Sequence, residues 1–107
     1  MTEAVMELGI MELGIIGEFR ARPGSEAAVE AAIRKVIPQS RAEHDCLAIT
    51  AWRSNRDAAL FFIHSRWTSE AAFEAHAALP HTVEFIATVE PLLTASKVEV
   101  ARLSQIA

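Results

Sequence analysis

Apolar and polar side chains alternate in the first strongly patterned stretch of the chain, residues 13–21. One face of this stretch carries four apolar side chains: Leu13, Ile15, Phe19 and Ala21. A period of two residues predicts a β-strand with one face toward the core. Gly17 lies inside the strand and is expected to allow a close approach of the backbone. The strand should end at Pro23 and Gly24, which favour a turn.

A helix is predicted directly after this turn. Ser25 suits the N-cap position, and Glu26 favours the positive end of the helix dipole. The apolar residues that follow have helical spacing: Val29, Ile33, Val36 and Ile37. They form a stripe that would pack against a sheet. Pro38 should kink or end the helix, because proline lacks an amide hydrogen and its ring crowds the preceding turn.

Two further strands are predicted at residues 46–53 and 58–67, joined as a hairpin by the polar sequence SNRD. Neither strand is polar at every second position, and residues 60–63 are all apolar. Strands of this kind need cover on both faces. One face of the second strand carries four side chains: Phe61, Ile63, Ser65 and Trp67. His64 and Arg66 belong to its other face.

The C-terminal half has the pattern of two helices and a final strand. Thr68 or Ser69 can cap a helix that runs through about Leu79. Pro80 allows a second helix from His81 to about residue 92. The apolar positions of this second helix are Val83, Ile86, Val89 and Leu93. Residues 97–103 then alternate as a strand.

The element order β-α-β-β-α-β predicts an α+β protein with the ferredoxin-like split β-α-β fold, in which both helices cover one face of an antiparallel sheet. The helices would leave the other face of the two middle strands uncovered. A second copy of the chain, related by a two-fold axis, would cover that face. The sequence therefore predicts a homodimer.

The length of 107 residues is that of one domain. Residues 1–11 contain most of the tandem sequence MELGIMELGI and are interpreted as a variable N-terminal extension. Residues 12–107 would then form the single domain. Truncation to Met11 should leave the melting temperature unchanged.

Composition and charge exclude several classes of protein. The chain is 51% hydrophobic, and no apolar run approaches the roughly 18 residues of a membrane span, so a soluble protein without a membrane partner is expected. The net charge of −4 and the scattered lysines and arginines argue against a nucleic-acid partner. The single cysteine, Cys46, excludes an intramolecular disulfide, fits a cytoplasmic location and is expected to be buried packing.

Three features make the chain similar to one known family: the ARPG turn, the apolar strand that ends at Trp67, and the sequence WTSEAAFEAHAALPH from Trp67 to His81. Over residues 13–103 the chain resembles the antibiotic biosynthesis monooxygenase (ABM) family of dimeric α+β barrel proteins. It departs from the family pattern at two places. Ser65 stands where the family commonly has a glutamate, and His44 and Asp45 stand where Pro-Gly is usual.

The resemblance implies oxygenation of an electron-rich phenol or quinol-type aromatic by dioxygen, without metal or flavin, to give a quinone. It also implies that the strand face bearing Trp67 looks toward the helices, with the pocket between them. His76 lies beside the apolar stripe of its helix and is the expected proton acceptor, because imidazole can take a phenolic proton near neutral pH. Trp67 would stack on the substrate and donate its N–H. His81 would supply a second polar contact, and the remaining pocket residues would be Phe61, Ile63, Ser65 and Phe85.

Each of these residues also has a purely structural interpretation. His76 would then be a core histidine bonded to the backbone, and His81 a helix-start residue facing water. Trp67 and Phe61 would be ordinary core aromatics. Two other functions stay open for the same fold. One is a haem-binding or haem-degrading protein with His76 as axial ligand, and the other is a non-enzymatic dimeric module that binds a small molecule.

The histidines match no metal motif in the sequence. His76 and His81 are five residues apart, whereas a helical zinc site uses a spacing of four, and no carboxylate stands at a motif position. The four glycines form no phosphate-binding loop. No metal, nicotinamide or nucleotide cofactor is therefore expected.

Overall fold

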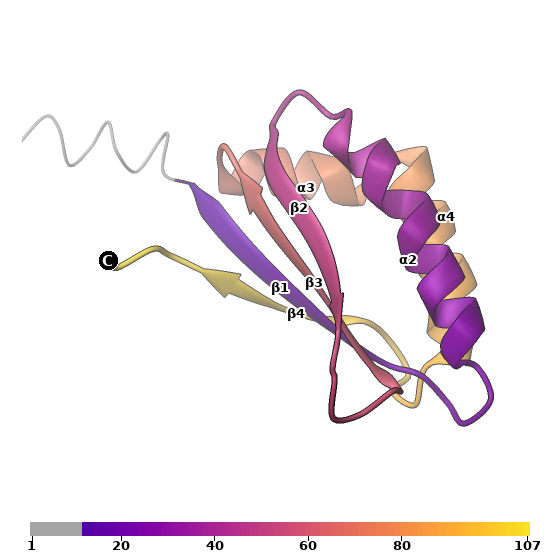
Figure 1. The fold of residues 1–107 in the computed structure, drawn as a ribbon. Helices are drawn as coiled ribbons and strands as arrows, with labels where there is room; N and C mark the ends of the chain where they lie inside the picture. The colour runs from indigo at the N-terminus through magenta and orange to yellow at the C-terminus, as the bar shows by residue number, and fades with distance from the viewer. Residues whose placement is uncertain (1–11) are drawn as a thin grey trace, which may run out of the picture.

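The structure is a computed structural model that describes residues 12–107, in which a four-stranded sheet packs against a layer of helices (Figure 1). The elements follow in chain order: β1 (Leu13–Arg20), α2 (Glu26–Arg41), β2 (Cys46–Arg53), β3 (Leu60–Trp67), α3 (Glu70–Ala77), α4 (Pro80–Val89), the 3₁₀ turn η1 (Glu90–Leu92) and β4 (Glu99–Leu103). The predicted extension at residues 1–11 lies outside the described residues. No helix within residues 12–107 is long and apolar enough to cross a membrane.

The strands are antiparallel and lie in the order β2-β3-β1-β4. β1 pairs with β3 along its whole length, from Leu13 opposite Trp67 to Arg20 opposite Leu60, and its other edge pairs with β4. β2 and β3 form the predicted hairpin. With all helices on one face of the sheet, this is the ferredoxin-like α+β fold, and the prediction of the fold is confirmed.

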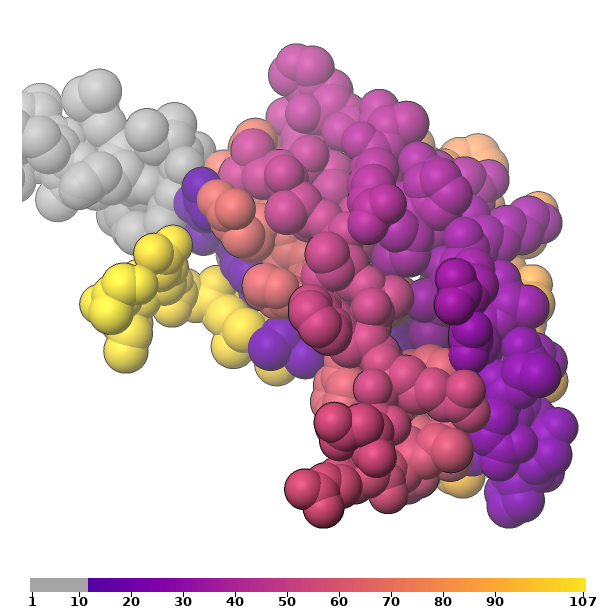
Figure 2. Space-filling view, viewed as in Figure 1, coloured from indigo at the N-terminus to yellow at the C-terminus, as the bar shows by residue number. Residues whose placement is uncertain are grey.

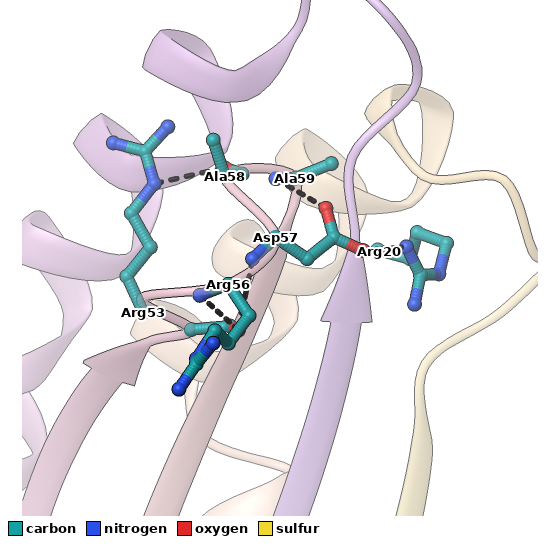
Figure 3. Close-up of polar contacts among 7 residues, drawn as sticks. Arg20, Arg53, Arg56, Asp57, Ala58 and Ala59 are labelled. Atoms are coloured by element: carbon teal, nitrogen blue, oxygen red, sulfur yellow. Dashed lines mark hydrogen bonds and ion pairs between the residues drawn. The ribbon is translucent and has the colours of Figure 1, made fainter.

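The turn between β2 and β3 is built from hydrogen bonds between side chains and backbone (Figure 3). Ser54 Oγ accepts a hydrogen bond from the N–H of Asp57, and Asp57 Oδ1 accepts one from the N–H of Ala59. The Asp57 carboxylate also pairs with Arg20 at the end of β1, at 2.5 Å. These bonds lengthen the turn, so β3 begins at Leu60, two residues later than predicted.

The sequence predicts that Pro38 kinks or ends helix α2, and the helix does not end there but continues to Arg41. A proline removes one intrahelical hydrogen bond. Contacts between the last turn of α2 and the rest of the protein compensate for this loss. Ile37 and Ser40 are buried. The Arg41 guanidinium donates two hydrogen bonds to the carbonyl of Ile49 in β2, at 3.0 and 3.2 Å. These contacts attach the end of α2 to the sheet.

The buried face of α4 agrees with the prediction at Val89, and Leu93 after the helix is also buried as predicted, but it differs at Val83. Val83 is 54% exposed, whereas Thr82, Phe85 and Val89 are buried. The helix begins at Pro80, and the three buried positions are separated by three and four residues, which is the spacing of one helical face. Val83 lies beside this face and points into solvent.

The side of the sheet that faces the helices forms the core. Along β3 the buried residues are Phe61, Ile63, Ser65 and Trp67, as the alternation predicts. Phe61 and Ile63 pack with the buried faces of α2 and α4, where the ring centroids of Phe19 and Phe85 lie 5.7 Å apart, edge to face. A second cluster contains Leu13, Ile15 and Trp67, at the end of the sheet where β1 begins.

The opposite side of the sheet is exposed and partly apolar. Three large apolar side chains on this side are 38%, 63% and 38% exposed, respectively: Ile16, Trp52 and Leu103. β4 is exposed at every residue, and the C-terminal segment stands away from the rest of the described molecule (Figure 2). The predicted homodimer depends on this uncovered face, and it stays a prediction.

Candidate functional site

A cavity of about 160 Å³ lies between the helices and the sheet. Its wall is apolar except at four side chains: Ser40, Ser65, His76 and Thr82. An apolar cavity of about 150 Å³ is large enough to hold benzene. The volume is therefore that of one aromatic ring, and the polar side chains could bind its substituents.

Among residues 12–107, His76 is the only titratable side chain in the wall of this cavity. It lies in the last turn of α3, and its side chain is 11% exposed. Its Nδ1 is 2.8 Å from Oε2 of Glu43. A carboxylate can only accept a hydrogen bond, so the neutral imidazole carries its proton on Nδ1 and has a free lone pair on Nε2. The ring is thus held in the tautomer of a proton acceptor.

Glu43 is a site residue that the sequence prediction missed. It follows α2, where its N–H bonds to the carbonyl of Ser40, and it precedes β2. The same Oε2 atom also accepts a hydrogen bond from Nε2 of His81, at 2.6 Å. The carboxylate is 13% exposed. Because Glu43 and His76 are 33 residues apart, no local motif in the sequence joins them.

Trp67 supports the site from behind rather than lining the cavity. It is 1% exposed, and its indole N–H donates to Oγ of Ser65 at 2.9 Å, which corrects the expectation that this N–H is free for a substrate. A buried indole N–H needs a partner, and Ser65 lies on the same face of β3. The indole packs against the imidazole of His76, with ring centroids 4.3 Å apart, and against Phe73. Trp67 therefore fixes the position of the histidine ring.

Only some of the other predicted pocket residues line the cavity in the structure. Ile63, Ser65 and Phe85 line the cavity. His81 does not line it, because its side chain turns to Glu43. Phe61 lines a surface groove between α2 and β2 instead.

Ser40 is a second site residue that the prediction missed. It is 1% exposed and lines the cavity, and within residues 12–107 its hydroxyl has no hydrogen-bond partner. Buried hydroxyl groups are almost always bonded, so an unpaired one calls for an explanation. The sequence did carry a signal, because Ser40 falls on the buried stripe of α2, three residues after Ile37.

Gly17 forms part of the cavity wall on β1. A Cβ atom built there would lie 3.1 Å from Cε1 of Phe19 and 3.7 Å from Cγ1 of Val100. The sequence predicts a close approach of the backbone at this glycine, whereas the nearest atoms in the structure belong to side chains. The absence of a side chain at this position leaves space in the cavity.

Three side chains near the cavity have the donor set of a metal site. Ligand atoms of Glu43, His76 and His81 lie within 4.8 Å of one another. The sequence argument against a metal relied on a missing carboxylate, and Glu43 supplies that carboxylate from a distant part of the chain. Haem fits less well, since the cavity is smaller than the roughly 300–1,000 Å³ that hold drug-sized ligands.

Cys46 lies near this cluster but is not activated. Burial raises the pKa of its thiol, and the negative charge of Glu43 raises it further. The thiol is therefore protonated at neutral pH, and a protonated thiol is a poor nucleophile. Cys46 is partly rather than fully buried, and it packs against both core clusters, as expected for a structural cysteine.

Comparison with known proteins supports the assignment that the fold suggests. Residues 13–88 match the antibiotic biosynthesis monooxygenase family. The chain is 29% identical over 82 residues to the protein Rv0793 of Mycobacterium tuberculosis, which covers 77% of this chain and 80% of that protein. The structure of Rv0793 superposes with a TM-score of 0.84 over 90% of this chain and 96% of that chain, at 27% identity.

The crystal structure of PA3566 from Pseudomonas aeruginosa superposes with a TM-score of 0.83, at 30% identity, over 91% of this chain and 96% of that chain. The sequence match, the fold and these superpositions agree over most of the described residues. The chain belongs to the antibiotic biosynthesis monooxygenase family.

Proposed function

We propose that this protein is a cofactor-independent monooxygenase that uses dioxygen to oxidise a small phenol or hydroquinone. Membership of the family supports monooxygenase chemistry. One observation carries the proposal further: the ring of His76 lines an apolar cavity while a carboxylate holds its Nδ1. Deprotonation of a phenol needs such a base beside a site from which water is excluded.

In the proposed reaction, Nε2 of His76 accepts the phenolic proton of the substrate. The carboxylate of Glu43 orients the ring and stabilises the imidazolium that forms, as a carboxylate does for the histidine of other catalytic groups. The phenolate gives an electron to dioxygen much more easily than the phenol does. A general base of this kind contributes about 10²- to 10⁴-fold to the rate.

The atoms and electrons balance without an external reductant. One oxygen atom of dioxygen forms a bond to a ring carbon that carries hydrogen, para to the phenolate oxygen in a phenol or next to a hydroxyl-bearing carbon in a hydroquinone, and the O–O bond breaks. The hydrogen on that carbon and the phenolic proton leave with the second oxygen atom as water. Dioxygen takes up all the electrons that the ring loses as it becomes a quinone, and His76 gives its proton back.

The cavity supports a substrate with a single aromatic ring. Its volume of about 160 Å³ is close to the roughly 150 Å³ that accommodates benzene. The hydroxyl of Ser40 is buried and is available to donate a hydrogen bond to the phenolate oxygen. The surrounding side chains are apolar, so they would hold the ring and dioxygen together away from water.

We also propose that two copies of the chain associate through the exposed side of the sheet. Trp52 and Ile16 expose apolar surface there, and an exposed apolar patch commonly marks an interface. The change Trp52→Glu should give a monomer in light scattering coupled to size exclusion. Val83→Glu is the matched control, because Val83 is a similarly exposed apolar residue on the helix side. A monomeric parent protein would contradict the proposal.

The test of the chemistry is oxygen uptake with a panel of single-ring hydroquinones. His76→Ala should lower the turnover number about 10²- to 10⁴-fold. His44→Ala is the control, since the side chain of His44 is 99% exposed. Glu43→Gln keeps an acceptor for His76 but removes the charge that stabilises the imidazolium, so it should also lower turnover.

Equal turnover in the parent and in His76→Ala would remove the histidine from this role. No turnover of any quinol by the parent would overturn the oxygenase and leave a protein that only binds small aromatic molecules. The measured product distinguishes oxygenation from simple oxidation, because one atom of labelled dioxygen must appear in the quinone.

A further inference from the structure

Glu43, His76 and His81 come from three different segments and meet at one point beside the cavity. Glu43 follows α2, His76 lies in the last turn of α3, and His81 lies in the first turn of α4. We propose that these three side chains bind a divalent transition-metal ion of the zinc type. We further propose, on the basis of the function proposed above, that the bound ion switches off the base.

The donor set is the one that such ions prefer. Two imidazole nitrogens and one carboxylate oxygen bind Zn²⁺ in catalytic sites and leave a fourth position for water, and a similar set binds Fe²⁺. Here all three ligand atoms lie within 4.8 Å of one another. The two neutral imidazoles and one carboxylate carry a single negative charge, which suits a dication.

The geometry requires only a small adjustment. Oε2 of Glu43 is 2.8 Å from Nδ1 of His76 and 2.6 Å from Nε2 of His81. Ligand atoms around a tetrahedral Zn²⁺ with bonds of about 2.0–2.2 Å are about 3.3–3.5 Å apart. The two N–H protons must therefore leave, and the two ligating nitrogens must move away from the carboxylate oxygen by roughly 0.5–0.9 Å as the ion enters.

The cluster is sheltered but open to solvent. The side chains of His76, Glu43 and His81 are 11%, 13% and 20% exposed, respectively. This burial limits their motion, and the exposed part gives an ion a path of entry. The hydroxyl of Thr82 lies 3.4 Å from Nδ1 of His76 and would be a neighbour of the bound ion. His44 and His64 are not part of the cluster, and both are exposed.

Binding of an ion changes the chemistry of His76 through its tautomer. The ion takes Nδ1, the nitrogen that in its absence donates to Glu43. A neutral imidazole bound through Nδ1 carries its proton on Nε2. Nε2 then has no free lone pair for a phenolic proton. The metal-loaded protein should therefore be inactive as a base-dependent oxygenase.

Isothermal titration of the metal-free full-length chain with Zn²⁺ tests the binding. We expect one ion per chain, and affinity lower by about tenfold or more in His81→Ala and in Glu43→Gln. His44→Ala and His64→Ala are the controls and should bind as the parent does. Circular dichroism shows whether each variant is folded. The two cluster variants differ in what they remove, because Glu43→Gln keeps a hydrogen-bond acceptor, whereas His81→Ala removes a whole ring.

Co²⁺ gives an independent readout, because a site with nitrogen and oxygen ligands in tetrahedral geometry produces visible absorption bands. These bands should appear with the parent and be lost in His81→Ala. Equal Zn²⁺ affinity in the parent and in both cluster variants, or no binding by the parent, would overturn the site.

Oxygen uptake tests the second part of the proposal. Zn²⁺ should inhibit the parent at concentrations that match its measured Kd, and the turnover that remains in His81→Ala should need about tenfold more Zn²⁺ for the same inhibition. Activation by Zn²⁺, or full activity with the metal site occupied, would overturn the proposal that the ion switches off the base, without contradicting the metal site itself. If the parent oxidises no quinol, the proposed function and with it the switch fail, and the titration still decides the metal site.

Discussion

Replacing Ser40 with alanine should make the protein more stable and its cavity poorer at holding a phenol. The hydroxyl is buried, and within residues 12–107 it has no hydrogen-bond partner. An unsatisfied buried polar group costs about 1–3 kcal/mol. Alanine also has a higher helix propensity than serine by up to about 0.5 kcal/mol, and part of the gain is offset by the small space left by the oxygen atom.

The expected net gain in the free energy of unfolding is therefore about 1 kcal/mol. For a domain of this size, 1 kcal/mol corresponds to a rise in melting temperature of about 4–8 °C. Urea unfolding and calorimetry measure both quantities. Gln39→Ala is the matched control, since Gln39 precedes Ser40 in α2 and is exposed, so it reports helix propensity alone.

Ligand binding should change in the opposite direction. Phenol should bind Ser40→Ala about 2- to 10-fold more weakly than the parent, because a hydrogen bond contributes about 0.5–1.5 kcal/mol. Toluene has a similar shape but no hydroxyl, so its affinity should not fall. Titrations followed by NMR measure both ligands. A variant that is less stable than the parent, or that loses phenol and toluene equally, would refute the role assigned to this hydroxyl.

Three further predictions follow from contacts of the described residues. Trp67→Phe removes the N–H that donates to Ser65 and leaves the buried Ser65 oxygen unpaired. Urea unfolding should then show a free energy of unfolding lower by about 2 kcal/mol, and an unchanged urea midpoint would contradict this. Burial raises the pKa of the Cys46 thiol, so iodoacetamide should label Cys46 more slowly than it labels glutathione at neutral pH. The labelling rate should increase as the pH rises, and rapid labelling at neutral pH would contradict the raised pKa. Arg20 lowers the pKa of the Asp57 carboxyl in the folded state. This pair therefore stabilises the protein at pH values above the ordinary carboxyl pKa, and the stabilisation is lost as the pH falls through the lowered pKa of the folded state. Asp57→Asn should flatten the acid dependence of the urea midpoint, most clearly at low salt because the pair is exposed.

The order of elements could be predicted because local patterns decide it. Alternation marks β1, the turn follows from Pro23 and Gly24, and the stripe ending at Ile37 marks α2. The errors occur where contacts distant in the sequence outweigh local preference. Pro38 does not end its helix, because Arg41 binds β2 and Ser40 is buried against the core.

The candidate site could be predicted only in part. Ile63 follows from strand parity and His76 from helix spacing, whereas Phe85 is expected only from the family resemblance; all three line the cavity. Glu43 could not be found, since its position depends on where α2 ends and how the chain turns into β2. Trp67 could be placed on the correct face of β3, but the partner of its N–H depends on side-chain packing that alternation does not report.

A single substitution at Gly17 would change the volume of the cavity, because this residue forms part of its wall. Its backbone does not need glycine, because the positive φ value within residues 12–107 belongs to Gly24. An added methyl group would meet the edge of the Phe19 ring, which is the movable end of a side chain. Ligand size is thus set on β1, while the histidine and its carboxylate lie on the opposite layer. Over evolutionary time, or in a directed-evolution experiment, the choice of substrate could therefore drift independently of the proton chemistry.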